Sequence, residues 1–111
     1  MIIADVRDDQ ILSRTLMSMG ADALLAIRDI EASFVIARTA ENEVGISARS
    51  KGNVNVQRIM EEMHGGGHFS AAAVQKQNTS VEALCEELKA TIDAYLLEAK
   101  EETIDESNLV K

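Results

Sequence analysis

The residues best suited to chemistry lie in one glycine-rich stretch, MHGGGHFSAAA, in which His64 and His68 flank three consecutive glycines, Gly65–Gly67. A histidine can transfer a proton, bind a metal or donate a hydrogen bond to a phosphate. Backbone without a Cβ can present several N–H groups to one anion, or approach a ligand closely. A single glycine is enough to end a helix, so three exceed that need. Two interpretations stay open: the glycines end a helix, or they let the backbone approach a group such as a phosphate.

A second candidate site lies in the stretch EVGISARS, which alternates between apolar and polar residues. In a strand, this alternation places Ser47 and Arg49 side by side on one face, opposite Val44, Ile46 and Ala48. A guanidinium can hold a phosphate through two parallel hydrogen bonds, and a hydroxyl adds a neutral donor. Exposure to solvent is the commoner use of such a polar face, and the strand taken alone favours that interpretation.

The sequence shows no complete catalytic or metal-binding set around these residues. A zinc site would need further His or Cys ligands, and the one cysteine, Cys85, lies on an apolar helical stripe that favours a packed thiol. No Ser-His-acid order and no cluster of aspartates is present. The glycines are not followed by Lys-Ser or Lys-Thr, so they do not form a P-loop. The residues alone therefore indicate an anion or nucleotide site without reaction machinery.

The strands that hold these residues can be assigned from apolar spacing. SFVIART predicts a strand over 33–39 that is buried on both faces, EVGISARS a strand over 43–50, and AAAVQKQ a strand over 71–77. The short turn between the first two predicts antiparallel pairing, and we expect the third in the same sheet.

Three helices are predicted from caps and apolar stripes. The first is expected to be capped by Asp9, with the stripe Leu12, Leu16, Met19 and Ala23. The second is expected to be capped by Asn55 and to end at the glycines, with the stripe Val56, Ile59, Met60 and Met63. A capping box of Thr79 and Glu82 begins the third, with the stripe Val81, Leu84, Cys85, Leu88, Ile92, Tyr95, Leu96 and Ala99. The fold class is therefore α/β: a small mixed β-sheet flanked by helices, with a long C-terminal amphipathic helix.

Length and charge narrow the class of protein. The 111 residues predict a single domain over 1–111, with a core at about 8–100 and a frayed acidic tail over 101–111. The net charge of −8 speaks against a protein that binds long nucleic acids by neutralising many phosphates, but allows a short phosphorylated ligand. One cysteine and the absence of a long apolar run indicate a cytoplasmic domain.

Three stretches together resemble the DHH-associated domain, the C-terminal substrate-binding domain of the DHH phosphoesterase superfamily: SARS (47–50), GNVNVQRIME (52–61) and GGGHFSAAA (65–73). The order of a strand with Ser-x-Arg, a short helix, a glycine-rich loop and a histidine followed by small residues is specific to that group. The stretch IEASFVIA with the helix NVQRIME is most similar to the cyclic-di-AMP phosphodiesterases of the GdpP type. The resemblance covers about residues 8–100.

The resemblance implies that this chain forms the second wall of a substrate cleft. The other wall would be a DHH catalytic domain in the same polypeptide, which holds manganese and hydrolyses the phosphodiester. No catalytic residue, metal or cofactor is then expected in this chain, which alone would be inactive. The ligand would be cyclic-di-AMP or a short 5′-phosphorylated oligonucleotide. The implied substrate-binding residues are Ser47, Arg49, Asn55, Gly65, Gly66, Gly67 and His68.

The same resemblance implies a bacterial signalling enzyme whose parent protein is membrane-anchored, with this domain in the cytoplasm, and it allows a homodimer. The chain departs from the family where His64 replaces the first of four glycines, Phe69 a common proline, and Ala71 an asparagine. The alternatives are the same domain of an oligoribonuclease/pAp phosphatase or RecJ-like exonuclease, and a non-catalytic nucleic-acid-binding module like the tail of alanyl-tRNA synthetase.

Overall fold

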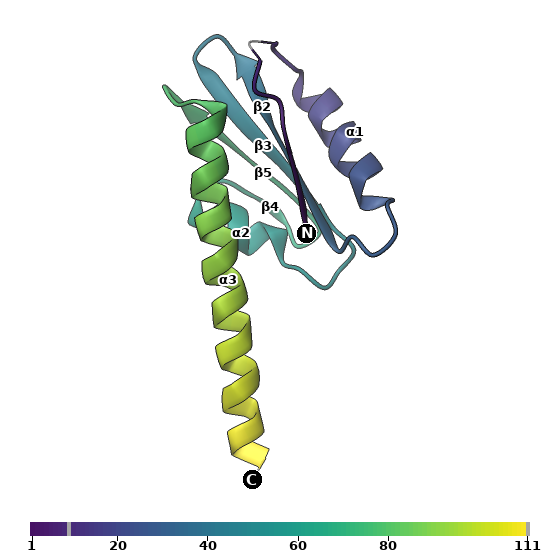
Figure 1. Ribbon diagram of the computed structural model, residues 1–111, viewed down its shortest axis with the longest axis vertical. Helices are drawn as coiled ribbons and strands as arrows, with labels where there is room; N and C mark the ends of the chain where they lie inside the picture. The colour runs from purple at the N-terminus through teal and green to yellow at the C-terminus, as the bar shows by residue number, and fades with distance from the viewer. Residues whose placement is uncertain (9, 111) are drawn as a thin grey trace.

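One mixed five-stranded sheet forms the centre of the protein, in the order β1-β2-β3-β5-β4 (Figure 1). The structure is a computed structural model that describes residues 1–8 and 10–110, with side chains described as far as residue 100. Strand β1 runs parallel to β2, and the other neighbours pair antiparallel. The strands are β1 (Ile2–Asp5), β2 (Ala32–Ala40), β3 (Glu43–Ser50), β4 (Gly66–His68) and β5 (Ala71–Gln77). The predicted α/β class and the antiparallel pairing of β2 with β3 are confirmed.

Helices cover both faces of the sheet. On one face, α2 (Val56–Glu62) and α3 (Val81–Val110) enclose the larger apolar core, and on the other α1 (Arg14–Leu25) encloses a smaller one. The larger core confirms the alternation predicted for β3 and the stripe predicted for α2. Its fully buried members include Phe34, Ile36, Val44, Ile46, Ala48, Ile59, Met60, Met63, Leu84 and Leu88.

The face that α1 buries differs from the predicted one. Met17 and Ala21 pack on the sheet, whereas Leu16 and Met19 of the expected stripe are 51% and 61% exposed. The helix carries apolar residues on two sides, and the side that faces β2 includes Ala21 and Gly20. An added Cβ at Gly20 would lie 3.7 Å from Val35, an ordinary contact distance, so packing does not require a glycine there.

The residues that cap two of the helices differ from the predicted ones. The cap of α1 is Ser13, whose Oγ accepts a hydrogen bond from the Leu16 N–H at 3.0 Å; Asp9, the predicted cap, lies outside the described residues. The cap of α3 is Ser80 rather than Thr79, because its Oγ accepts from the Ala83 N–H at 3.0 Å. Serine and threonine are both good caps, so residue type alone does not predict which of two neighbouring hydroxyl residues caps a helix.

The third helix packs along the sheet and then extends beyond it (Figure 1). Its backbone is helical to Val110, where the sequence predicted a frayed tail from residue 101, and Lys111 lies outside the described residues. Cys85 is buried on the core side, as its stripe predicted. Burial, followed by a hydrogen bond with Asp5, raises the pKa of the Cys85 thiol, which favours a packed and unreactive group.

Candidate phosphate-binding site

The end of α2 shows what the histidine before the glycines does. His64 takes the left-handed conformation with φ of 68°, its N–H donates to the Glu61 carbonyl at 3.0 Å, and the Gly65 N–H donates to the Met60 carbonyl at 2.7 Å. This is the Schellman arrangement, in which the left-handed position is usually a glycine. His64 therefore ends the helix, and helix termination does not explain the glycine run.

The glycines themselves form most of β4, an edge strand that the sequence did not predict. At Gly65, an added Cβ would overlap the Ala73 carbonyl oxygen and lie 2.6 Å from the Val74 Cβ. At Gly67, which has φ of 145°, it would lie 2.5 Å from the Ala72 Cα. These two glycines are therefore required by the close approach of β4 to β5.

Gly66 differs from its neighbours because an added Cβ would meet nothing within 4 Å. Packing does not require a glycine at this position. The open space in front of Gly66 belongs to a shallow hollow of about 230 Å³ on the α1 face of the sheet. We refer to this hollow as the Arg49 hollow. Its lining residues are Ser18, Ser47, Arg49, Gly66, Gly67 and Ala71–Ala73.

The Arg49 hollow brings together four residues from distant parts of the predicted site: Ser47 and Arg49 on β3, and Gly66 and Gly67 on β4. Strand β5 lies between β3 and β4, with Ala71 opposite both Arg49 and His68 in the two registers. The small side chains of β5 leave the space between the arginine and the glycine backbone open. An anion in this hollow would meet a guanidinium and a hydroxyl from β3 and glycine backbone from β4.

Arg49 is held on two sides. Its Nε donates to Asp22 Oδ1 at 3.1 Å, one terminal nitrogen donates to the Ala48 carbonyl at 2.8 Å, and its side chain is 20% exposed. Guanidinium has five N–H groups in a rigid plane, so most of them stay available. The arginine is therefore fixed in orientation and can still offer a fork to a phosphate.

Helix α1 supplies two site residues that the sequence analysis missed. Asp22 holds Arg49, and the Ser18 Oγ lies 3.3 Å from the Ser47 Oγ. Their spacing of four residues repeats along one side of a helix, as Ser47 and Arg49 repeat along one side of a strand. These two spacings could have paired Ser18 with Ser47 and Asp22 with Arg49 from the sequence alone. The apolar stripe predicted for α1 instead placed the wrong side of the helix against the sheet.

The remaining predicted site residues lie around the rim of this region or behind it. His68 is exposed at the end of β4, beside the turn whose Phe69 carbonyl accepts from the Val56 N–H at 3.0 Å. Asn55 caps α2 as predicted, accepting from the Arg58 N–H at 3.1 Å, and its own N–H donates to the Tyr95 hydroxyl at 2.9 Å. Neither His68, Asn55 nor Gly65 lines the Arg49 hollow, and their contact with a ligand stays a prediction.

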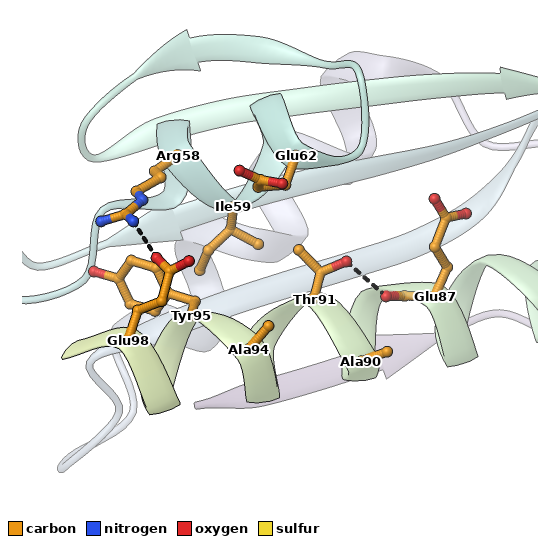
Figure 2. A pocket seen from close by; sticks show the side chains of 9 residues that line it. All are labelled: Arg58, Ile59, Glu62, Glu87, Ala90, Thr91, Ala94, Tyr95 and Glu98. Carbon is orange, nitrogen blue, oxygen red and sulfur yellow. Dashed lines mark hydrogen bonds and ion pairs between the residues drawn. The ribbon is translucent and has the colours of Figure 1, made fainter. Parts of the chain in front are cut away.

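A somewhat larger hollow, of about 280 Å³, lies on the other side of the sheet between α2 and α3 (Figure 2). Ile59, Ala90 and Ala94 form its floor. At one end the Arg58 guanidinium lies 5.9 Å from the centre of the Tyr95 ring and pairs with Glu98. None of the residues predicted to bind substrate lines it, and its surrounding glutamates oppose an anion.

Among the described side chains, those of residues 1–8 and 10–100, no group of three or more His, Cys, Asp or Glu is placed to hold a metal ion. In the same part of the chain, no helix combines the length and the hydropathy that crossing a bilayer requires.

Comparison with known proteins identifies the family. The model of the DHHA1 domain matches residues 1–98, so the chain belongs to the DHHA1 family, the DHH-associated domains that the three stretches resembled. It is 47% identical to the cyclic-di-AMP phosphodiesterase GdpP of Bacillus subtilis over 88 residues, which cover 79% of this chain and 13% of that protein. It is 40% identical to the cyclic-di-AMP phosphodiesterase PdeA of Listeria monocytogenes over 95 residues, covering 86% of this chain and 14% of that protein.

A third relative is a membrane protein–large ribosomal subunit bL9 fusion protein of Onion yellows phytoplasma, 43% identical over 77 residues, which cover 69% of this chain and 9% of that protein. The chain thus spans between 9% and 14% of the length of these relatives.

Proposed function

We propose that this chain is the substrate-binding domain of a DHH-family phosphodiesterase that hydrolyses cyclic-di-AMP to pApA. Two relatives of at least 40% identity are named cyclic-di-AMP phosphodiesterases. The observation that carries the proposal for this chain is the Arg49 hollow, which collects a guanidinium, two hydroxyls and glycine backbone from separate elements.

Recognition of the nucleotide phosphate rests on Arg49. Its free N–H groups donate to two phosphate oxygens, and a hydrogen bond to a charged group contributes about 1.5–3 kcal/mol. The Ser47 hydroxyl and the backbone around Gly66 add neutral donors, and the missing side chain at Gly66 lets the ligand approach. Because Asp22 already fixes the guanidinium, less side-chain entropy is lost on binding than for a free arginine.

Cleavage belongs to the rest of the parent protein. A manganese-bearing DHH domain in the same polypeptide would supply a metal-activated water. In this proposal the chain orients the substrate. We further propose a membrane-anchored parent, in line with the phytoplasma relative named a membrane protein, and a dimer of such parents.

Steady-state kinetics of two Arg49 variants in the complete parent protein test this proposal. We expect Arg49→Ala to lower kcat/KM on cyclic-di-AMP by about 10- to 100-fold, corresponding to the loss of one charge-assisted fork. Arg49→Lys should lower it almost as much, because a point charge does not replace the planar fork. The fold should survive, since no core atom is lost.

Arg28→Ala is the matched control, because Arg28 is an exposed arginine in the loop after α1 that does not line the hollow. Full activity of Arg49→Ala would contradict the proposal, as would a loss that follows unfolding in thermal melts. Faster hydrolysis of linear pApA than of cyclic-di-AMP would assign the domain to an oligoribonuclease instead.

A further inference from the structure

The hollow between α2 and α3 lies on the other face of the sheet from the Arg49 hollow, and the proposed function does not use it. We refer to it as the α2–α3 hollow. It measures about 280 Å³ and runs along α3 from Glu87 to Glu98 (Figure 2). These two residues are 11 positions apart, which is about 16 Å or three turns of helix. The hollow is therefore as long as a short helical segment of a partner.

The floor of the α2–α3 hollow is apolar. Ile59 is fully buried beneath it, and Ala90 and Ala94 are about one turn apart on the exposed side of α3. The Thr91 hydroxyl donates to a backbone carbonyl of its own helix at 2.8 Å, and the Tyr95 hydroxyl accepts from a backbone N–H at 2.9 Å. The small alanine side chains let another helix approach closely, and helix axes pack about 8–10 Å apart. The floor therefore suits aliphatic side chains.

The rim of the α2–α3 hollow is acidic. Figure 2 shows Glu98 and Glu87 at its two ends on α3 and Glu62 across from them on α2. Arg58, the cation in the lining, pairs with Glu98, and Lys76 lies 3.5 Å from Glu87. Among the described residues, Glu62 has no ion-pair partner. The rim thus keeps an uncompensated negative charge, which favours a partner that carries Lys or Arg beside its apolar residues.

Arg58 shows how one end of the hollow holds a cation. Its guanidinium lies 5.9 Å from the centre of the Tyr95 ring and pairs with the Glu98 carboxylate, so a ring and a carboxylate share the charge. The opposite end has the carboxylates of Glu62 and Glu87, but no cation among the residues that line it. A basic residue from outside this chain would complete that end in the same way.

We propose that the α2–α3 hollow is a docking site for a basic amphipathic helix of a partner protein. Aliphatic residues of the partner lie on Ile59, Ala90 and Ala94, and a Lys or Arg lies between Glu62 and Glu87. A helix with apolar residues at i, i+3 or i+4 and i+7 fills a groove of three turns in this way. Because the two hollows lie on opposite faces of the sheet, this site is independent of the proposed function.

Titration of the chain with three model peptides, followed by amide shifts in NMR spectra, tests the proposal. The first is a capped helical peptide of about 16 residues in which leucines repeat at i, i+3, i+4 and i+7 and lysines cover the opposite side. The second has the same composition with the leucine spacing scrambled, and the third has glutamates in place of the lysines. We expect the first peptide to shift the amides of Ile59, Ala90 and Ala94, and the other two to bind at least about 10-fold more weakly.

Two variants with matched controls place the peptide in the hollow. Ala94→Leu fills the floor and should weaken binding about 10-fold, whereas Ala23→Leu, the same change on an exposed side of α1, should have no effect. Glu62→Gln should weaken binding about 3-fold, whereas Glu41→Gln, which removes the same charge from the exposed β2–β3 turn, should not. Cyclic-di-AMP should bind Ala94→Leu as it binds the unmodified chain, so the two sites are tested separately.

Equal affinity for the patterned and scrambled lysine peptides would overturn the docking site, because it would show a general attraction to an acidic chain. Unweakened binding by both Ala94→Leu and Glu62→Gln would overturn it as well, as would a spectrum that the first peptide leaves unchanged. Shifts of the same amides on dilution of the free chain would assign the hollow to a second copy instead. Thermal melts of the variants separate a filled hollow from a lost fold.

Discussion

Among single residues, the three glycines have different roles. Gly65 and Gly67 are fixed by the backbone of β5, against which an added Cβ would collide. Gly66 has open space in front of it and lines the Arg49 hollow. A glycine that packing does not require, at the edge of a hollow that contains an arginine, is most simply explained by a ligand that approaches the backbone there.

Alanine substitutions separate these roles. Gly67→Ala should lower the free energy of unfolding by about 1–3 kcal/mol, through overpacking against β5 and a backbone angle that disfavours a side chain. Gly66→Ala should change it by less than about 0.5 kcal/mol, yet weaken binding of cyclic-di-AMP. Urea unfolding and ligand titration of both variants provide the measurements. If Gly66→Ala binds as the unmodified chain does, the backbone at Gly66 does not contact the ligand.

At the level of elements, helix caps explain where the chain changes direction. Ser80 rather than Thr79 caps α3, so the two hydroxyls form a matched pair for experiment. Ser80→Ala should cost about 1 kcal/mol of unfolding free energy, because the Ala83 N–H loses its partner, and Thr79→Ala should cost clearly less. Urea unfolding of the two variants measures the difference. A larger loss for Thr79→Ala would return the cap to the position that the sequence predicted.

Elements with a side-chain pattern were predictable from the sequence, and elements without one were not. The alternation in β3, the stripe of α2 and the stripe of α3 as far as Tyr95 follow directly from burial on one face. Leu96 and Ala99, which the prediction also placed in the α3 stripe, are exposed because the helix extends beyond the sheet there. Strand β4 has almost no side chains to show a period, and it is defined by its register with β5. Strand β1 has four residues at a sheet edge, paired only with β2. Such short strands depend on tertiary pairing, which a local pattern does not show.

Part of the candidate site was also predictable from side-chain patterns in the sequence. Ser47 and Arg49 share a strand face, and the glycine run stands out, so both appear in the sequence. Their meeting in one hollow depends on the sheet order, which places β5 between β3 and β4. The contribution of Asp22 and Ser18 depends on which side of α1 faces the sheet. That side could not be predicted, because the helix carries apolar residues on two sides.

For the molecule as a whole, the distribution of charge is compatible with the anionic ligand that we propose. Acidic α3 and α1 lie on opposite faces of the sheet (Figure 1). The Arg49 hollow lies on the face that α1 covers. Charges that are exposed to solvent and separated by more than about 8 Å are largely screened at physiological salt. The net charge of −8 therefore weighs little on binding of an anion in the Arg49 hollow, where Arg49 acts locally.

One ion-pair cluster joins the N-terminal strand to the last helix and sets a pH dependence. The Arg7 guanidinium, 2.9 Å from the Asp5 carboxylate, lowers the pKa of Asp5 below its ordinary value of 3.8, and Arg7 also lies 3.6 Å from Glu82 at the start of α3. A carboxyl whose pKa is lowered in the folded state stabilises the fold at pH values above the ordinary pKa of the group. That stabilisation is lost as the pH falls through the lower, folded value.

We therefore expect Asp5→Asn to lower stability at pH 7 and to have little effect at a pH below the folded pKa of Asp5. Urea unfolding of both proteins across this range is the measurement. The effect should be small, because the pair is partly exposed. An equal loss of stability at both ends of the pH range would show that Asp5 acts by packing and not by charge.

The central claim is that the Arg49 hollow holds a nucleotide phosphate, and NMR titration of the chain with cyclic-di-AMP tests it most directly. The account predicts that the largest shifts occur at the backbone amides of Gly66 and Gly67, and that both vanish in Arg49→Ala. Shifts confined to the hollow between α2 and α3, around Ala90, Ala94 and Tyr95, would contradict it. So would a spectrum that cyclic-di-AMP leaves unchanged.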